Sequence, residues 1–304
     1  MNTLNKRQFC QKISLILLGA STSKGLFAKT PIGNPRIVSI GGANTEIIHE
    51  LGLHPYLVGI DTSSNYPQSI THLPNVGYAR ALSLEGVLSL RPTHVLSTDM
   101  VGPAHVLESI KKYKGVQLER VNTTSSFEGL IQHVQFIANL FGKSDSGYQL
   151  SRRLQQEMNA VEELNAFKKL KPLQVDQDLL SKAGLPRVLF ILSHQSSQVV
   201  AGGLNTAAHA MIEYAGGKNV MDQVRGYKTL NKEAFIQINP DILLMTSQSE
   251  KFLRGPMSLL RDPSMVQISA IKNNRIVVMD ANQLLGFGPR LPLTIGQLRK
   301  SFFA

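Results

Sequence analysis

The sequence predicts an α/β fold in which two similar α/β lobes are joined by a long backbone helix, with a ligand cleft between the lobes. Three observations predict it. Strand-like and helix-like segments alternate through both halves of the chain. A stretch without proline or glycine, from Tyr148 to Leu170, separates the halves. Segments of the first half also recur in the second, and the 304 residues are enough for two lobes of ordinary domain size.

The first half is expected to hold four strands and four helices. The strands are short apolar runs, and polar residues such as Asn44 and Ser83 are typical N-caps for the helices. Pro92 ends the second helix, because proline cannot continue it. The expected strands cover 36–40, 57–60, 94–98 and 116–120, and the expected helices cover 44–51, 83–90, 103–113 and 125–140.

The second half alternates in the same way after the separating helix. That helix carries an apolar stripe at spacings of three and four, which includes Leu150, Leu154 and Phe167, and it predicts a stiff strut with small lobe movement on binding. The expected strands cover 188–192, 242–246 and 276–279, and the expected helices cover 206–214, 232–238 and 293–302. We therefore expect a signal peptide at 1–28, an N-terminal lobe at 29–145, a linking helix at 146–171 and a C-terminal lobe at 172–304.

Three matching pairs of segments predict an internal duplication. The longest pair aligns SLEGVLSLRPTHVLST with NKEAFIQINPDILLMT without a gap. A Gly-Gly-x-Asn-Thr turn also occurs in each half, after an expected strand that starts with Arg36 or Arg187, and we expect both turns near the ligand cleft. The matched pairs are 83–98 with 231–246, 77–82 with 226–230, and 41–45 with 202–206.

Composition excludes several classes of protein. Hydrophobic residues make up 42% and charged residues 17%, which is typical of a globular chain. The sequence has no run of 18 apolar residues, so it predicts no membrane-spanning helix. Cys10 is the only cysteine, which excludes a disulfide or a cysteine-based metal cluster within one chain. The net charge of +11 favours an anionic ligand or a membrane surface, but no basic patch with interleaved aromatics predicts nucleic-acid binding.

The first 28 residues have the pattern of a secretory signal. Basic residues at Lys6, Arg7 and Lys12 precede a short apolar run at 13–20, and Ala28 ends an acceptable cleavage site. An amphipathic first helix of the fold is the alternative. Because Cys10 comes before the apolar run and not after it, we expect a periplasmic protein that is not a lipoprotein. The pattern leaves open which export route is used.

Four segments carry a resemblance to a known family. The longest is VGYARALSLEGVLSLRP, which begins at Val76, and the last is Gly-Phe-Gly-Pro-Arg, which ends at Arg290. From residue 35 onward the chain resembles the helical-backbone class of substrate-binding proteins of ABC importers, which serve haem, siderophores and vitamin B12. These segments resemble most the haem (hemin) carriers of the class. They lie at 76–92, 200–212, 226–228 and 286–290.

The resemblance implies that Tyr78 is a ligand of haem iron. Phenolate is a hard oxygen donor that suits ferric iron. Arg80 lies two residues further on, where its charge favours the phenolate form or pairs with a haem propionate. The alternative for Tyr78 is a half-buried loop tyrosine with a hydrated hydroxyl.

The second lobe offers further candidates. In some relatives a histidine binds the second face of the haem, and His194, which follows an expected strand, is the candidate here. His209 is its competitor, although a place inside a helix favours packing, and some relatives use tyrosine alone. By the internal repeat, Tyr227 and Lys228 take the places of Tyr78 and Arg80, so Lys228 is a candidate partner of a propionate and Tyr227 a candidate lining residue. Other candidates for the pocket lining are Met100 and His105.

Glu85 and Glu233 form a pair that the repeat aligns. In the class that the chain resembles, one carboxylate from each lobe docks onto arginines of the membrane permease. Each glutamate also lies in the first turn of an expected helix, where it complements the helix dipole, and this is the alternative. A glycosidase-like carboxylate pair is discounted, because the two lie in separate helices.

The resemblance as a whole implies a periplasmic haem-binding protein. It carries ferric protoporphyrin IX to an inner-membrane ABC permease, as a monomer and without chemistry of its own. The sequence has no G-x-S-x-G, H-E-x-x-H or Walker motif, and therefore predicts no enzyme. The alternatives are a ferric-siderophore or vitamin B12 carrier of the same class, and a secreted metal protein or enzyme that uses histidines. One haem or two, and the presence of a second axial ligand, stay open.

Overall fold

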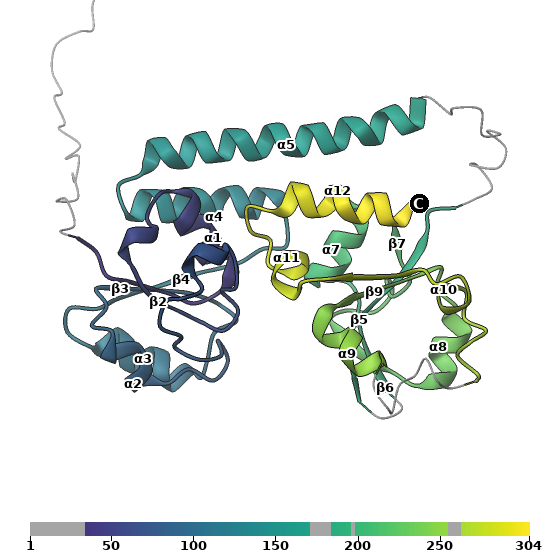
Figure 1. Ribbon diagram of the computed structural model, residues 1–304, viewed down its shortest axis with the longest axis horizontal. Helices are drawn as coiled ribbons and strands as arrows, with labels where there is room; N and C mark the ends of the chain where they lie inside the picture. Colours follow the sequence, from purple (N-terminus) through teal and green to yellow (C-terminus); the bar gives the residue numbers. More distant parts are fainter. Residues whose placement is uncertain (1–33, 171–183, 196–197, 255–262) are drawn as a thin grey trace, which may run out of the picture. The chain divides into compact units, whose positions relative to one another are not determined.

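The computed structural model describes residues 34–170, 184–195, 198–254 and 263–304 (Figure 1). The expected signal peptide therefore lies outside the described residues. No helix in these ranges is long and apolar enough to cross a membrane.

The N-terminal lobe is a parallel four-stranded sheet with helices on both faces. Its strand order is β2-β1-β3-β4, and every neighbouring pair is parallel. The strands are β1 (Ile37–Ser39), β2 (Leu57–Ile60), β3 (His94–Thr98) and β4 (Gln117–Val121). The helices are α1 (Gly42–Glu50), α2 (Leu84–Ser89), α3 (Ala104–Lys112) and α4 (Phe127–Leu140), with short 3-10 turns η1 (His54–Tyr56) and η2 (Gln68–Ile70).

Neighbouring residues of the central strands belong to different cores. Ile37 and Leu96 belong to the core with α1 and α4, whereas Val38 and Val95 belong to the core with α2 and α3. The two pairs of helices accordingly cover opposite faces of the sheet (Figure 1). Burial on both faces explains why these strands are continuous apolar runs and not alternating ones.

The C-terminal lobe has a mixed sheet in the order β10-β9-β5-β6-β8, with β7 beside β5. The strands β10, β9 and β5 are parallel, while β6 is antiparallel to both of its neighbours. The strands are β5 (Arg187–Gln195), β6 (Gln198–Gly202), β7 (Lys218–Asn219), β8 (Tyr227–Leu230), β9 (Ile242–Thr246) and β10 (Ile276–Met279). The helices are α7 (Ala207–Tyr214), α8 (Lys232–Ile238), α9 (Ser247–Arg254), α10 (Ser269–Lys272), α11 (Ala281–Leu285) and α12 (Leu291–Phe302).

The β5–β6 pair corrects the expectation for this region. The sequence predicted that a strand ends at Leu192 and that His194 follows it. Instead β5 continues to Gln195 and pairs antiparallel with β6, so that His194 lies within β5 opposite Val199. The second Gly-Gly turn consequently follows β6 and not the strand that begins with Arg187.

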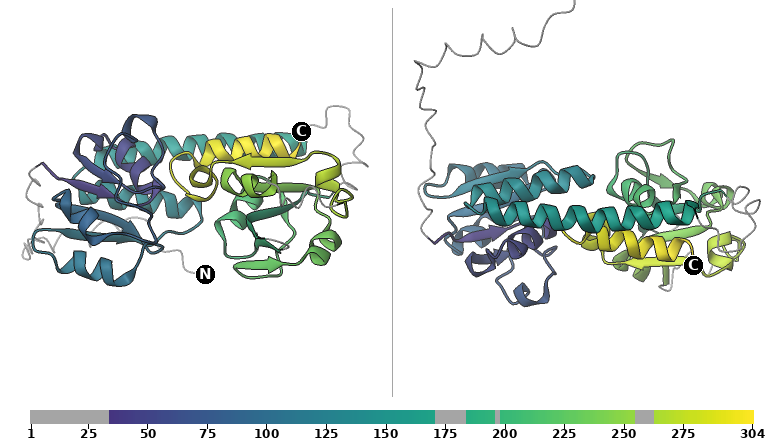
Figure 2. Two further views of the ribbon diagram at one scale, coloured as in Figure 1. Left: turned by 60° about the horizontal axis from the view of Figure 1, so that its bottom comes forward. Right: turned by 90° about the horizontal axis from the view of Figure 1, so that it is seen from above.

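The long helix between the lobes is confirmed as α5 (Ser144–Leu170), which begins four residues before the expected Tyr148. Its buried residues Leu150 and Leu154 belong to one continuous core with α4 and with Ile295 of α12. α5 contacts both helices, and the right-hand view of Figure 2 shows it running along them. The two lobes therefore share one core through α5.

Candidate functional site

The loop that carries Tyr78 is fixed on both sides by backbone hydrogen bonds. Gly77 has a φ of +98°, a conformation that glycine adopts without strain. The N–H of Leu82 donates to the carbonyl of Gly102 at 3.2 Å, and the N–H of Gly102 donates to that of Ala79 at 2.9 Å. The Tyr78 side chain is 53% exposed on this supported turn. A fixed backbone and an exposed phenol suit a residue that binds a ligand.

The corresponding loop of the second lobe leads into the edge strand β8. Tyr227 and Lys228 are its first residues and pair with Gly202 and Ala201 of β6. The turn beneath them is tight, since a Cβ at Gly203 would lie 2.0 Å from the carbonyl oxygen of Val224. Tyr227 and Lys228 are thus presented by sheet backbone, and both side chains are exposed.

The structure brings Arg80 of the first lobe near Tyr227 of the second. Although 41% of Tyr227 is exposed, the protein around its hydroxyl raises the pKa of the phenol, and the positive charge of Arg80 lowers that pKa in part. An electrostatic effect of this kind requires the two groups to lie close to each other. Arg80 and Tyr227, which belong to the two loops that the internal repeat relates, are therefore within electrostatic range of each other.

The two histidine candidates have different positions. The backbone of His194 lies in the β5–β6 hairpin, and its side chain lies outside the described part of the structure. His209 is half-buried on α7, where its Nδ1 accepts a hydrogen bond from Nδ2 of Asn219 at 3.2 Å. The same amide nitrogen donates to the carbonyl of Gly202. His209 therefore has the packing environment that its place in a helix predicted.

Met100 lies on the loop next to that of Tyr78. It is 59% exposed and follows β3, two residues before Gly102, which bonds the Tyr78 loop. Asp99 holds this loop, because one of its carboxylate oxygens accepts from the N–H and the hydroxyl of Thr123 at 3.2 and 2.8 Å. His105 is exposed further on, in the first turn of α3.

Glu85 and Glu233 lie in equivalent first turns, of α2 and α8. The N-cap hydrogen bonds of these helices are made by other residues, Ser83 and Asn231, which accept from Gly86 and Ala234 at 3.2 and 2.9 Å. Both glutamates are exposed. Their carboxylates are therefore not needed to cap the helices by hydrogen bonding, although the helix dipole still favours them.

The structure adds a pair of residues that the sequence did not single out. Arg290, from the Gly-Phe-Gly-Pro-Arg segment, makes two hydrogen bonds to the carboxylate of Glu46 in α1. One sequence signal could have drawn attention to Glu46: it is an acidic residue followed directly by two apolar residues, in a helix that covers a core. Its partner could not be named, because Arg290 is 244 residues away.

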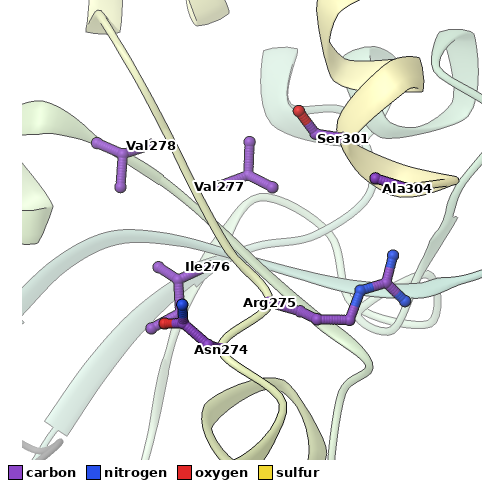
Figure 3. A pocket seen from close by; sticks show the side chains of 7 residues that line it. All are labelled: Asn274, Arg275, Ile276, Val277, Val278, Ser301 and Ala304. Carbon is purple, nitrogen blue, oxygen red and sulfur yellow. The ribbon is translucent and has the colours of Figure 1, made fainter.

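A cavity of about 450 Å³ lies elsewhere, between β10 and the end of α12 (Figure 3). None of the predicted site residues lines it. Its arginine, Arg275, donates to the carbonyl of Phe302 at 2.7 Å and so holds the end of α12. In the described residues no group of three or more histidine, cysteine, aspartate or glutamate residues is arranged to hold a metal ion.

A comparison of the sequence with models of protein families identifies the family of this chain. The model described as "periplasmic binding protein" matches residues 37–283. The chain belongs to this family. Its members are periplasmic or extracellular binding proteins, which confirms the two-lobed fold and the expectation that the chain is not an enzyme.

Three relatives illustrate the likeness. A structure of the periplasmic heme-binding protein BhuT in complex with two hemes has 34% identity, covers 89% of this chain and 98% of its own, and gives a TM-score of 0.77. The substrate-binding lipoprotein YvrC of a Bacillus subtilis (strain 168) ABC transporter is 25% identical over 88% of this chain and 80% of its own length. The high-affinity heme uptake system protein IsdE of Staphylococcus aureus is 27% identical over 87% and 85%.

Proposed function

We propose that this periplasmic binding protein carries haem and delivers it to an ABC permease. The likeness to the haem complex of BhuT, at 34% identity and over 98% of that chain, is the observation that carries the proposal. The residues of the candidate site suit the chemistry of haem, which combines ferric iron, two propionates and a flat apolar ring. The chain provides a phenol, Tyr78, two cations, Arg80 and Lys228, and an aromatic ring, Tyr227, and the charge of Arg80 acts on Tyr227.

The proposed ligand of the iron is Tyr78. Phenolate binds ferric iron well, and the exposed position of Tyr78 leaves its oxygen accessible. Arg80 stabilises the phenolate or pairs with one propionate, and Lys228 pairs with the other. Tyr227 lies against the porphyrin, and His194 is the candidate for the second axial position. The haem then lies between the two lobes.

The proposal extends to the partner and to export. Glu85 and Glu233 dock onto cationic residues of the permease, one from each lobe. Residues 1–28 act as a signal peptide, 29–145 and 172–304 form the lobes, and 146–171 link them. The protein works as a monomer without a lipid anchor, in contrast to the lipoprotein YvrC.

A titration with hemin tests the haem proposal. The purified protein and its Tyr78→Phe variant are titrated with hemin and followed by absorption. We expect saturable binding by the protein, and a changed ferric spectrum or weaker binding in the variant. Tyr113→Phe is the matched control, because Tyr113 is also exposed, at 54%, but lies at the end of α3.

Other outcomes of the titration separate the alternatives. Absence of specific hemin binding would overturn the proposal, and the next titrations would use ferric siderophores and vitamin B12. Saturable binding with the same spectrum in Tyr78→Phe would keep the function but reject Tyr78 as the ligand, and His194 would be changed next.

A further inference from the structure

A buried ion pair joins α1 of the first lobe to the segment before α12 of the second. Nη2 of Arg290 lies 2.6 Å from Oε1 of Glu46, and its Nε lies 3.1 Å from Oε2. The guanidinium also lies over the ring of Tyr66, 4.0 Å from its centroid. The side chains of Glu46 and Arg290 are only 5% and 17% exposed. We call Glu46, Tyr66 and Arg290 the cross-lobe clamp.

The charged form of Glu46 depends on Arg290. Burial raises the pKa of the Glu46 carboxyl, and the hydrogen bonds and charge of Arg290 counteract that rise. Asp280 and Glu50 act in the opposite direction, because their negative charges disfavour a further anion. Without Arg290, the carboxylate would be buried without a cation, which is a strongly unfavourable state.

The two lobes also approach each other closely at this point. A Cβ at Gly288 would lie 3.3 Å from Oε2 of Glu46, and a Cβ at Gly42 would lie 3.4 Å from the Cβ of Asn282. Asn65 donates to Asp280 at 3.1 Å, and Asn282 donates to Asn65 at 3.3 Å. The Gly-Phe-Gly-Pro-Arg segment is therefore a joint, in which glycine allows close contact and arginine supplies the charge.

The joint is connected to the Tyr78 loop through one short segment. Tyr66 and Asn65 belong to the loop after β2, in which the N–H of Thr62 donates to the carbonyl of Gly77 at 2.9 Å. Gly77 immediately precedes Tyr78. The same loop is held from below by the buried Asp61, which accepts from Ser63 and Ser64 among others. A movement of the clamp would thus be transmitted to Tyr78 through the loop after β2 and the hydrogen bond between Thr62 and Gly77.

We propose that the cross-lobe clamp positions Tyr78 against the second lobe, and that Glu46 and Arg290 are positioning residues that slow the release of haem. The role in release rests on the proposed function, whereas the role in lobe position does not. Because a bidentate arginine–carboxylate pair fixes both distance and orientation, we expect its loss to let the lobes sample a wider range of separations.

The experiment measures lobe separation and haem release in the same variants. Spin labels are attached at Lys111→Cys on α3 and Lys272→Cys on α10, two exposed positions, with Cys10→Ser to remove the native thiol. Double electron–electron resonance then gives the distribution of distances between the two labels in the protein without ligand. Hemin release to apomyoglobin gives the off-rate. Unfolding by urea shows whether each variant is folded.

Glu46→Gln is the main variant, because it keeps the shape and removes the charge. We expect a broader distance distribution and hemin release that is faster by about tenfold. Arg290→Lys keeps the charge but cannot make the two parallel hydrogen bonds of the guanidinium, so we expect an intermediate effect on the distances and on hemin release. Glu157→Gln is the matched control, because it removes an exposed 3.8 Å ion pair, to Arg153, that involves no clamp residue. It should behave like the parent protein.

The outcomes separate the two proposals. An unchanged distance distribution in folded Glu46→Gln and Arg290→Lys would overturn the clamp, whatever the release rates. A broader distribution with unchanged release would overturn the positioning role. If the parent protein binds no hemin, the proposed function fails, while the distances measured without ligand still decide whether the clamp holds the lobes.

Discussion

Arg36 and Arg187 make the same two contacts in the two lobes. Arg36 donates to the carbonyls of Leu90 and Arg91 at 2.8 and 3.0 Å. Arg187 donates to those of Ile238 and Asn239 at 2.5 and 2.9 Å, which are the equivalent positions of the repeat. Arg91 and Asn239 share a left-handed backbone, with φ of +47° and +42°. The duplication in the sequence is therefore preserved in the ends of helices α2 and α8.

Arg36→Ala and Arg187→Ala should each destabilise the protein. Each change removes two charge-assisted hydrogen bonds to carbonyls at or just after the C-terminal end of a helix, and we expect the free energy of unfolding to fall by about 1–2 kcal/mol. Because the two sites lie in different lobes without shared partners, the double variant should show the sum. Urea unfolding measures this. Arg120→Ala, an exposed change on β4, is the control. If the Arg36 and Arg187 variants have the same free energy of unfolding as that control, the capping role is contradicted.

His133 should make the protein less stable in mild acid. It is buried on α4, its Nε2 lies 2.6 Å from Oδ1 of Asn44, and burial lowers its pKa from 6.5 to about 4. The unfolded chain binds the proton at the higher pKa, so this stability is complete above pH 6.5 and is lost as the pH falls towards 4. The loss from this group is about 3 kcal/mol when complete.

Comparison with His133→Gln isolates that contribution. Other titrating groups are common to both proteins and cancel in the difference between their unfolding free energies. We expect the difference to narrow as the pH is lowered from 7 to 4.5, because only the parent protein loses stability through His133. A difference that stays constant over this range would show that His133 is not the cause.

Arg80→Gln should raise the pKa of the Tyr227 phenol. The charge of Arg80 lowers this pKa against the effect of burial, and the variant removes only that charge. Ultraviolet absorbance during an alkaline titration follows tyrosine ionisation, and Tyr227→Phe identifies the relevant transition. Arg120→Gln serves as the control for a change of net charge. If the Tyr227 transition does not move, the loops of the two lobes do not face each other in solution.

Two glycines in helices should respond oppositely to alanine. A Cβ at Gly147 in α5 would lie 2.4 Å from the Cβ of Ala138 in α4, whereas a Cβ at Gly296 in α12 would have no neighbour closer than 3.9 Å. Gly147→Ala should therefore destabilise the protein by about 1–3 kcal/mol through overpacking. Gly296→Ala should stabilise it by up to about 1 kcal/mol through helix propensity. Thermal unfolding measures both, and equal effects would contradict close contact between α4 and α5.

Glu85→Gln and Glu233→Gln should impair transport without affecting hemin binding. Both carboxylates are exposed, and the helix N-caps are provided by Ser83 and Asn231. Uptake of haem by cells that depend on this protein would fall, while the affinity for hemin and the stability would stay near those of the parent. Normal uptake in the double variant would reject docking through these residues.

Secondary structure with local signals could be predicted from the sequence. The N-cap Ser83, the proline after α2 and the apolar spacing in α5 act within one or two turns, and these elements appear as expected. Asn44 was wrong as an N-cap, because it lies inside α1, whose N-cap is Gly41. The β5–β6 hairpin was missed, because Ser193, His194 and Gln195 are polar and gave no apolar run beyond Leu192. Their backbone is fixed by pairing with β6.

The arrangement of the site depended on contacts that are distant in the sequence. The repeat and the resemblance selected Tyr78, Arg80 and Tyr227 as candidates, but spacing alone could not place Arg80 near Tyr227 across the lobes. Likewise, no local pattern links Glu46 to Arg290, since each depends on how two separate sheets are packed onto α5.

The separation of Glu46 and Arg290 by 244 residues has a consequence for biosynthesis. A chain that emerges from its N-terminus exposes Glu46 long before its counter-ion exists, so α1 cannot reach its final environment until the segment before α12 has followed. Contacts of such long range form late, because a large loop must close first. A nascent chain halted before residue 290 would contain the strands of both sheets. Glu46 in its first lobe would nevertheless lack Arg290, its cationic partner. Completion of the first half of this protein therefore waits for its last helix.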